Sequence, residues 1–170
     1  MRLARGVLIP EKVLLERVSA MAAAISADTP PDATLSVLAL LDGAFIFCAD
    51  LVRGLTVPVR LALVPLPSVR RGGDPGHLAL PLDFPVEGTE LLVVEDILDS
   101  GRTLGALRGA LLARRPRRVR IAVLLDKPDG REVPLTPDYV GFTVPNRWIV
   151  GYGLDAEGLY RNLPYVTYVE

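Results

Sequence analysis

The chain has 170 residues, half of them apolar, so a single domain can bury a sizeable core without a partner or a metal. Nineteen Lys and Arg residues against 20 Asp and Glu residues leave a formal net charge of −1, which disfavours a dedicated nucleic-acid-binding protein. One cysteine, Cys48, excludes an internal disulfide or a multi-cysteine zinc site, and one histidine, His77, excludes a His-based metal cluster or triad. The chemistry must therefore come from carboxylates, Lys, Arg and backbone amides.

The sequence also bears on cellular location. No apolar run approaches the roughly 20 residues that a membrane span needs, and no apolar signal segment follows Met1. We therefore expect a cytoplasmic protein with no membrane partner. Only Lys12 and Lys127 among the basic residues are lysines, which makes each of them informative, because arginine serves elsewhere in this chain wherever a solvated charge suffices.

Helical and strand patterns alternate along the chain. Apolar residues at spacings of four, three and four predict an amphipathic first helix that buries Leu14, Val18, Met21 and Ile25. In chain order we expect a helix over 11–27, a strand over 34–41, a helix over 45–52 that stops near residue 54, a strand over 57–64, an edge strand over 77–84, a strand over 91–94 that ends in two acids, a helix over 103–113, a strand over 119–125, and short strands over 139–144, 148–152 and 165–169 with a short polar helix before the last. The alternation predicts one α/β domain with a mostly parallel twisted sheet, whose ligand site lies beyond the carboxyl ends of the strands.

Acidic residues follow the strand expected at 91–94. Glu95 and Asp96 end this strand and point to opposite sides, where they can meet a polyhydroxyl group or a hydrated divalent cation. Residues 100–103, Ser-Gly-Arg-Thr, then open a helix, whose unpaired amides and dipole predict a phosphate cradle. A carboxylate at its lip would be repelled by bound phosphate, so Asp99 points elsewhere and is the candidate general base. The plainer alternative is that these residues only cap the helix and fill a loop.

Residues 93–104, which read VVEDILDSGRTL, resemble the phosphoribosyl diphosphate (PRPP) loop of type I phosphoribosyltransferases, in the variant found in hypoxanthine-guanine enzymes. Residues 138–142, 145–155 and 160–164 are similar to the purine-binding hood of the same family. The resemblance covers nearly the whole chain. It implies a type I phosphoribosyltransferase-like fold in one domain, residues 1–170, with a core over about 30–127 and a hood lobe from the N-terminal segment and about 128–170.

The resemblance implies an enzyme of purine salvage that transfers the phosphoribosyl group from PRPP to hypoxanthine and/or guanine, giving IMP or GMP and diphosphate. It implies Mg²⁺ as the cofactor and a homodimer or homotetramer. Asp99, Lys127 and Arg161 would be catalytic, with Asp99 as the general base, Lys127 donating to the 6-oxo group and Arg161 contacting the diphosphate. The other implied contacts are Glu95, Asp96, Ser100, Gly101, Arg102, Thr103, Asp42 and Gly43 for PRPP, Lys127, Trp148, Ile149 and Asp155 for the purine, and Glu95, Asp96 and Asp155 for the metal.

Two positions depart from the family pattern. Asp42 stands where the family usually has lysine; its carboxylate either points away while the backbone still works, recruits magnesium, or weakens PRPP binding. Val69 stands where a tyrosine usually closes over the transition state. These departures support an alternative, in which the chain is a weak or inactive homologue that binds PRPP or a purine nucleotide as a regulatory protein. The alternative is opposed by five residues that keep the family pattern: Glu95, Asp96, Asp99, Lys127 and Asp155.

A third reading starts from the arginines of residues 114–120, RRPRRVR, which invite a nucleic-acid-binding function. Because this segment spans the end of one helix and the start of the next strand, we interpret it as a solvated turn whose cations complement the helix dipole. The overall charge balance agrees with this interpretation, so no nucleic-acid partner is expected.

Overall fold

The computed structural model describes residues 3–4, 6–65 and 84–170. Its helices and strands, in chain order, are α1 (Glu11–Ala27), β1 (Leu35–Leu41), α2 (Phe45–Gly54), β2 (Val59–Pro65), β3 (Glu90–Leu98), α3 (Arg102–Leu112), β4 (Arg118–Asp126), the 3₁₀ helix η2 (Pro128–Gly130), β5 (Tyr139–Thr143), β6 (Ile149–Val150) and β7 (Thr167–Tyr168). The three expected long helices and the expected strands within the described residues are confirmed, with boundaries shifted by a few residues, whereas η2 was not expected. The largest shift is in β3, which runs on to Leu98 and so includes the two acids that the sequence placed at its end.

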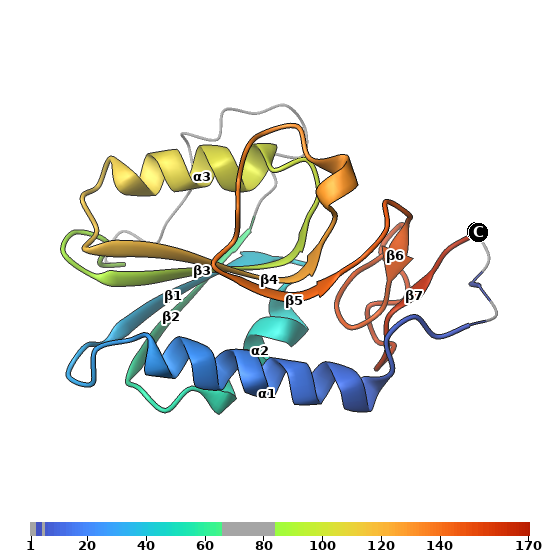
Figure 1. Ribbon diagram of the computed structural model, residues 1–170, viewed down its shortest axis with the longest axis horizontal. Coiled ribbons are helices and arrows are strands. Elements are labelled where there is room, and N and C mark those ends of the chain that lie inside the picture. The colour runs from blue at the N-terminus through green and yellow to red at the C-terminus, as the bar shows by residue number, and fades with distance from the viewer. Residues whose placement is uncertain (1–2, 5, 66–83) are drawn as a thin grey trace.

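A five-stranded parallel sheet in the order β2-β1-β3-β4-β5 forms the centre of the molecule. Figure 1 shows α3 on one face of this sheet and α1 with α2 on the other. Because β1 and β3 are buried on both faces, they read as continuous apolar runs in the sequence. The predicted α/β class with a parallel sheet flanked by helices is confirmed.

Each face of the sheet has its own apolar core. On one face the four predicted residues of α1, Leu14, Val18, Met21 and Ile25, are all buried, and they pack with Phe47 and other residues of α2. On the other face Leu104, Leu107 and Leu111 of α3 are buried against the strands. Cys48 lies in the first core, where burial raises the pKa of its thiol to about 11, as expected of a small core residue.

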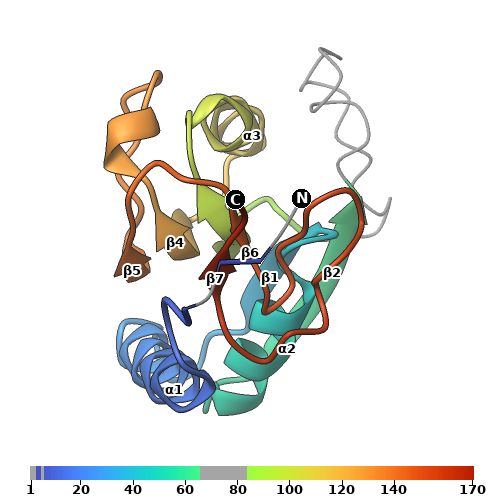
Figure 2. The same cartoon turned by 90° about the vertical axis from the view of Figure 1, so that its right-hand side faces the viewer.

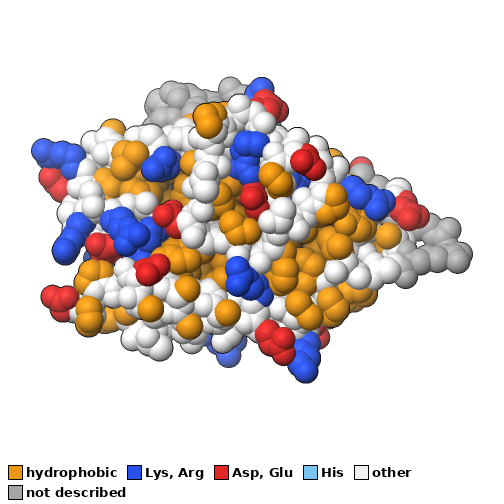
Figure 3. Space-filling view, viewed as in Figure 1, with side chains coloured by type: hydrophobic (Ala, Val, Ile, Leu, Met, Phe, Trp, Pro, Cys, Tyr) orange, Lys and Arg blue, Asp and Glu red, His pale blue; other side chains and the backbone are white. Residues whose placement is uncertain are grey.

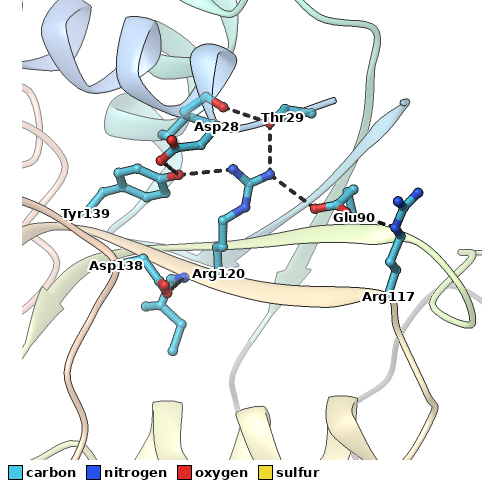
Figure 4. Close-up of polar contacts among 9 residues, drawn as sticks. Asp28, Thr29, Glu90, Arg117, Arg120, Asp138 and Tyr139 are labelled. Carbon is cyan, nitrogen blue, oxygen red and sulfur yellow. Dashed lines mark hydrogen bonds and ion pairs between the residues drawn. The ribbon is translucent and has the colours of Figure 1, made fainter. Parts of the chain in front are cut away.

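A buried arginine lies between α1 and the amino-terminal ends of the central strands. Arg120 on β4 has no exposed surface, although its sequence context suggested a solvated turn, so the prediction was wrong at this residue. Its guanidinium donates to Thr29 Oγ1 at 2.8 Å and to the Tyr139 hydroxyl at 3.0 Å, and it lies 3.6 Å from the buried Glu90 carboxylate (Figure 4). The Tyr139 hydroxyl in turn donates to Asp28 Oδ2 at 2.8 Å. The hydrogen bonds and the neighbouring carboxylate offset the cost of burying the charge of Arg120.

The other arginines of the turn are exposed, as expected. Arg115 pairs with Glu87 at 2.8 Å, and Arg117 lies 3.6 Å from Glu90. On the face seen in Figure 3, the basic side chains at the left-hand end lie beside acidic ones. This mixture of signs fits the solvated-turn interpretation rather than a nucleic-acid surface.

The small sheet β6-β7 extends from one end of the molecule, and Figure 2 views that end directly. The N-terminal segment joins it through bridges of Leu3 with Val169 and of Ile9 with Val166. Residues 128–170 contribute to both sheets, because β5 pairs with β4 in the large one. The predicted division into a core over about 30–127 and a hood from the N-terminal segment and about 128–170 therefore stays a prediction.

The short polar helix expected before residue 165 is wrong. Residues 151–164 form turns and isolated bridges instead. The physical reason is the backbone conformation, since Glu157 and Tyr160 both have positive φ, which a right-handed helix does not allow.

Several expectations concern residues outside the described part. The edge strand expected at 77–84 falls there except for Phe84, as do Val69 and His77. In the described residues, no helix is both long enough and apolar enough to cross a membrane.

Candidate active site

Two adjoining cavities open at the carboxyl ends of β3 and β4. The smaller, of about 110 Å³, is lined by Glu95, Asp96, Ile97, Leu98, Asp99, Ser100, Gly101, Thr103 and Leu104. The larger, of about 290 Å³, is lined by Asp96, Ile97, Asp99, Lys127, Trp148, Ile149, Leu154, Asp155 and Glu157. Because Asp96, Ile97 and Asp99 line both cavities, the two form one continuous cleft, at the place where parallel sheets bind ligands.

The acidic pair at the end of β3 forms the floor of this cleft. Glu95 and Asp96 are both buried, with exposed fractions of 8% and 4%. Asp96 Oδ1 accepts a hydrogen bond of 2.8 Å from the backbone N–H of Ile97. Its Oδ2 faces Gly43, where a Cβ would lie only 1.6 Å from it. Any side chain at position 43 would therefore have to displace the Asp96 carboxylate.

The start of α3 encloses the smaller cavity. Gly101 is the N-cap, with a left-handed φ of 80°, and the helix begins at Arg102. The amino-terminal end of α3 therefore borders a cavity that Ser100, Gly101 and Thr103 line, which is where the sequence predicts a phosphate cradle. The side chain of Arg102 does not line either cavity; it is largely exposed and pairs with Glu132.

Asp99 and Lys127 meet where the two cavities join. Lys127 Nζ lies 3.4 Å from Asp99 Oδ2 and is buried, with its side chain 8% exposed. The lysine follows β4, and its backbone N–H donates to Leu98 O at 2.9 Å, which fixes it against the end of β3. The structure therefore brings together an acceptor and a point-like donor that are 28 residues apart in the chain.

The far wall of the larger cavity comes from the segment around β6. Trp148 is 59% exposed, which leaves its indole ring available to a ligand, and its Nε1 lies 3.4 Å from Asp155 O. Ile149 is buried beside it. A flat polarizable face opposite a buried lysine suits an aromatic heterocycle that carries a hydrogen-bond acceptor.

Arg161 links this wall to the first turn. Its guanidinium donates to Gly153 O at 2.7 Å and pairs with Asp155 Oδ1 at 2.8 Å. Asp42 Oδ2 lies 3.9 Å from the same guanidinium, with its side chain 76% exposed. The Asp42 carboxylate therefore faces the arginine rather than pointing away from the site.

The three predicted metal ligands are not gathered into one cage. Within the described ranges, no group of three or more His, Cys, Asp or Glu side chains could hold a metal ion alone. Glu95 and Asp96 lie on β3, whereas Asp155 lies across the larger cavity and is paired with Arg161. This donor set, with carboxylates on two sides of an open cleft, fits a hydrated cation that also takes oxygen atoms from a substrate.

Five cavity residues were missed in the sequence. Two of them, Leu98 and Leu104, are apolar residues within the motif of residues 93–104. Ile97 lies between the predicted acids, and its position in that motif was a usable signal. Leu154 immediately precedes Asp155, so the motif containing Asp155 indicated it. Glu157 had no signal in the sequence, because it enters the cavity through turns that were expected to be helical.

Comparison with known proteins agrees with this geometry. The model of the phosphoribosyl transferase domain family matches residues 11–157. The chain is 39% identical to the hypoxanthine-guanine phosphoribosyltransferase of Lactococcus lactis over 163 residues, 94% of this chain and 88% of that one. It is 38% identical to the Aquifex aeolicus protein of the same name, covering 96% and 93% of the two chains.

A solved structure is similar over the whole chain. The hypoxanthine-guanine phosphoribosyltransferase of Bacillus anthracis superimposes with a TM-score of 0.88 at 36% identity and covers 98% of each chain. The sequence matches, the parallel sheet and the cleft at its carboxyl edge all lead to the same assignment: this chain belongs to the phosphoribosyl transferase family, among relatives named for hypoxanthine and guanine.

Proposed function

We propose that this chain is a purine-salvage enzyme that transfers the phosphoribosyl group of PRPP to hypoxanthine and/or guanine. The observation that carries the proposal is the placement of Asp99 and Lys127, 3.4 Å apart, where the two cavities join. One cavity has the first-turn amides of α3 for a phosphate, and the other has Trp148 for a purine ring. A 6-oxopurine suits Lys127, because a buried ammonium donates to an oxygen and not to an amino group.

In the proposed reaction, N9 of the purine attacks the anomeric carbon of the ribose while the bond to the diphosphate oxygen breaks. Asp99 accepts or holds the proton at N7 of the purine, which keeps the ring nucleophilic. Lys127 donates to the 6-oxo group, and Trp148 and Ile149 hold the ring. Glu95 and Asp96 bind the ribose hydroxyls, and Arg161 binds the departing diphosphate.

Magnesium is the cofactor that this donor set fits. Asp155 and the pair Glu95 and Asp96 would hold it through oxygen atoms and water, and bound Mg²⁺ would neutralise charge on the diphosphate. We further propose that the protein is cytoplasmic and that it forms a homodimer or homotetramer. Light scattering at micromolar protein concentration would test the oligomeric state.

The function is tested by incubating the protein with PRPP, MgCl₂ and each of hypoxanthine, guanine, xanthine and adenine, with products separated by chromatography. We expect nucleotide and diphosphate to form in equal amounts from hypoxanthine or guanine and not from adenine. No conversion of any base, by folded protein that binds GMP, would overturn the proposal in favour of the regulatory-protein alternative, which no comparison supports.

The role of Lys127 is tested by Lys127→Gln. Losing a charged donor to the 6-oxo group is worth roughly 1.5–3 kcal/mol, so kcat/KM for hypoxanthine should fall at least about tenfold. Lys12→Gln is the matched control, since Lys12 is the only other lysine and is exposed on α1. Unchanged efficiency of Lys127→Gln with hypoxanthine would contradict the 6-oxo assignment.

The effect of Asp42 is tested by Asp42→Lys and Asp42→Asn. Because the Asp42 carboxylate faces Arg161, we expect it to repel the diphosphate of PRPP and to compete for the guanidinium. Both variants should lower KM for PRPP by a few-fold, less so at high salt, and leave KM for hypoxanthine unchanged.

Asp32→Lys makes the same change of charge on the exposed loop before β1 and serves as the control for Asp42. A higher KM for PRPP in Asp42→Asn would contradict the repulsion and would instead favour a part for Asp42 in holding magnesium.

A further inference from the structure

The segment between Ile149 and Asp155 turns through three successive left-handed residues. Gly151, Tyr152 and Gly153 have φ values of 98°, 50° and 102°. The turn is closed by hydrogen bonds in both directions between the backbones of Gly151 and Leu154, at 3.0 and 3.1 Å. Glycine adopts this conformation readily, but tyrosine does so only where the surroundings hold it there.

Helix α2 holds Tyr152 in this conformation. The tyrosine side chain is 4% exposed, and its hydroxyl donates a hydrogen bond of 2.6 Å to Asp50 Oδ2. Burial and this hydrogen bond raise the pKa of Tyr152, so the hydroxyl remains a donor. The backbone N–H of Tyr152 also donates to Leu163 O at 2.8 Å, which anchors the turn from its other side.

The helix that carries Asp50 also carries the first turn of the cleft. α2 begins at Phe45, immediately after the turn that contains Asp42 and Gly43. The same turn touches the left-handed segment directly, because a Cβ at Gly153 would lie 2.2 Å from Gly43 O. Residues 151–155 are therefore fixed to the first turn at Gly153 and, through the hydroxyl of Tyr152, to the middle of the helix that follows it.

We propose that Tyr152 and Asp50 are positioning residues, which hold the purine wall of the cleft in register with the side that binds diphosphate. Neither residue lines either cavity, so the pair acts through Asp155, Trp148 and the first turn. The inference rests on the proposed function. When the hydrogen bond is lost, each side of the cleft keeps the groups that contact its own substrate, so each substrate binds as before. The two sides shift relative to each other, however, so the reacting atoms are less well aligned.

The test is Tyr152→Phe, which removes only the hydroxyl. We expect kcat to fall about tenfold, while KM for PRPP and KM for hypoxanthine each change less than about twofold. Asp50→Ala should have the same effect. The double variant of Tyr152→Phe and Asp50→Ala should have a kcat no lower than that of either single variant, since both substitutions remove the same hydrogen bond. Asp50→Asn keeps an acceptor oxygen and should retain most of the activity.

Two control variants separate this role from general stability. Tyr165→Phe removes a hydroxyl from the same region for which no hydrogen bond is found among the described residues, and Arg53→Gln removes the 3.8 Å ion pair of Asp50 without touching Tyr152. Both should keep the kcat of the original protein.

While the original protein is active, an unchanged kcat per folded molecule in Tyr152→Phe would overturn the inference. This holds whether the substitution raises KM, lowers Tm or changes neither. An original protein that converts no base would overturn the proposed function, and the inference with it.

Discussion

Asp99→Asn is expected to lower kcat for hypoxanthine by about 10²-fold or more, because general-base catalysis contributes roughly that much and Asn cannot accept the proton. Binding of GMP should change only about threefold or less, since the other groups that we propose to hold the nucleotide remain: Trp148, Lys127 and the amides at the start of α3. The two quantities are measured by steady-state kinetics and by calorimetric titration with GMP.

Asp129→Asn is the matched control, because Asp129 is an exposed carboxylate on the neighbouring η2 that lines neither cavity. It should leave both quantities unchanged. Equal losses of kcat and of GMP affinity in Asp99→Asn would contradict the assignment of Asp99 as the base and would make it a binding residue.

Arg120→Met is expected to lower the free energy of unfolding by about 3–5 kcal/mol, the usual cost of removing one member of a buried ion pair. The substitution leaves the buried Glu90 carboxylate with only the exposed Arg117 beside it and removes the hydrogen bonds to Thr29 and Tyr139 (Figure 4). Urea denaturation followed by fluorescence of the single tryptophan, Trp148, measures the loss.

Arg118→Met is the control, because Arg118 begins the same strand and is exposed; it should change stability by about 0.5 kcal/mol or less. Adding Glu90→Gln to Arg120→Met removes the negative charge that has lost its buried partner and should restore part of the loss. A loss in Arg120→Met no larger than in Arg118→Met would show that the network does not stabilise the fold.

Much of the fold could be predicted from the sequence because its signals are local. The apolar spacing of α1 and the continuous apolar run of β1 each point to one kind of element, and both were placed to within a residue. The acids at the end of β3 and the glycine before α3 likewise made the carboxyl edge recognisable as a site.

What could not be predicted depends on contacts between distant residues. Arg120 reads as part of a basic turn, and only the approach of Thr29 and Glu90 from other elements makes its burial possible. The strand expected over 148–152 ends earlier, and the residues after it are turns rather than a helix, because nothing local shows that Tyr152 adopts a left-handed conformation. Its hydrogen bond to Asp50 on α2 supports that conformation. The direction of the Asp42 carboxylate was left open for the same reason, since its neighbour Arg161 lies far along the chain.

The most direct test of the arrangement as a whole is a crystal structure of the protein with GMP. The account predicts the guanine ring against the indole of Trp148, its 6-oxo oxygen within hydrogen-bond distance of Lys127 Nζ, and the 5′-phosphate on the amides at the start of α3. It would be contradicted by GMP bound elsewhere, such as the separate cavity lined by Phe84 and Arg114, or by GMP in the same cleft with base and phosphate exchanged.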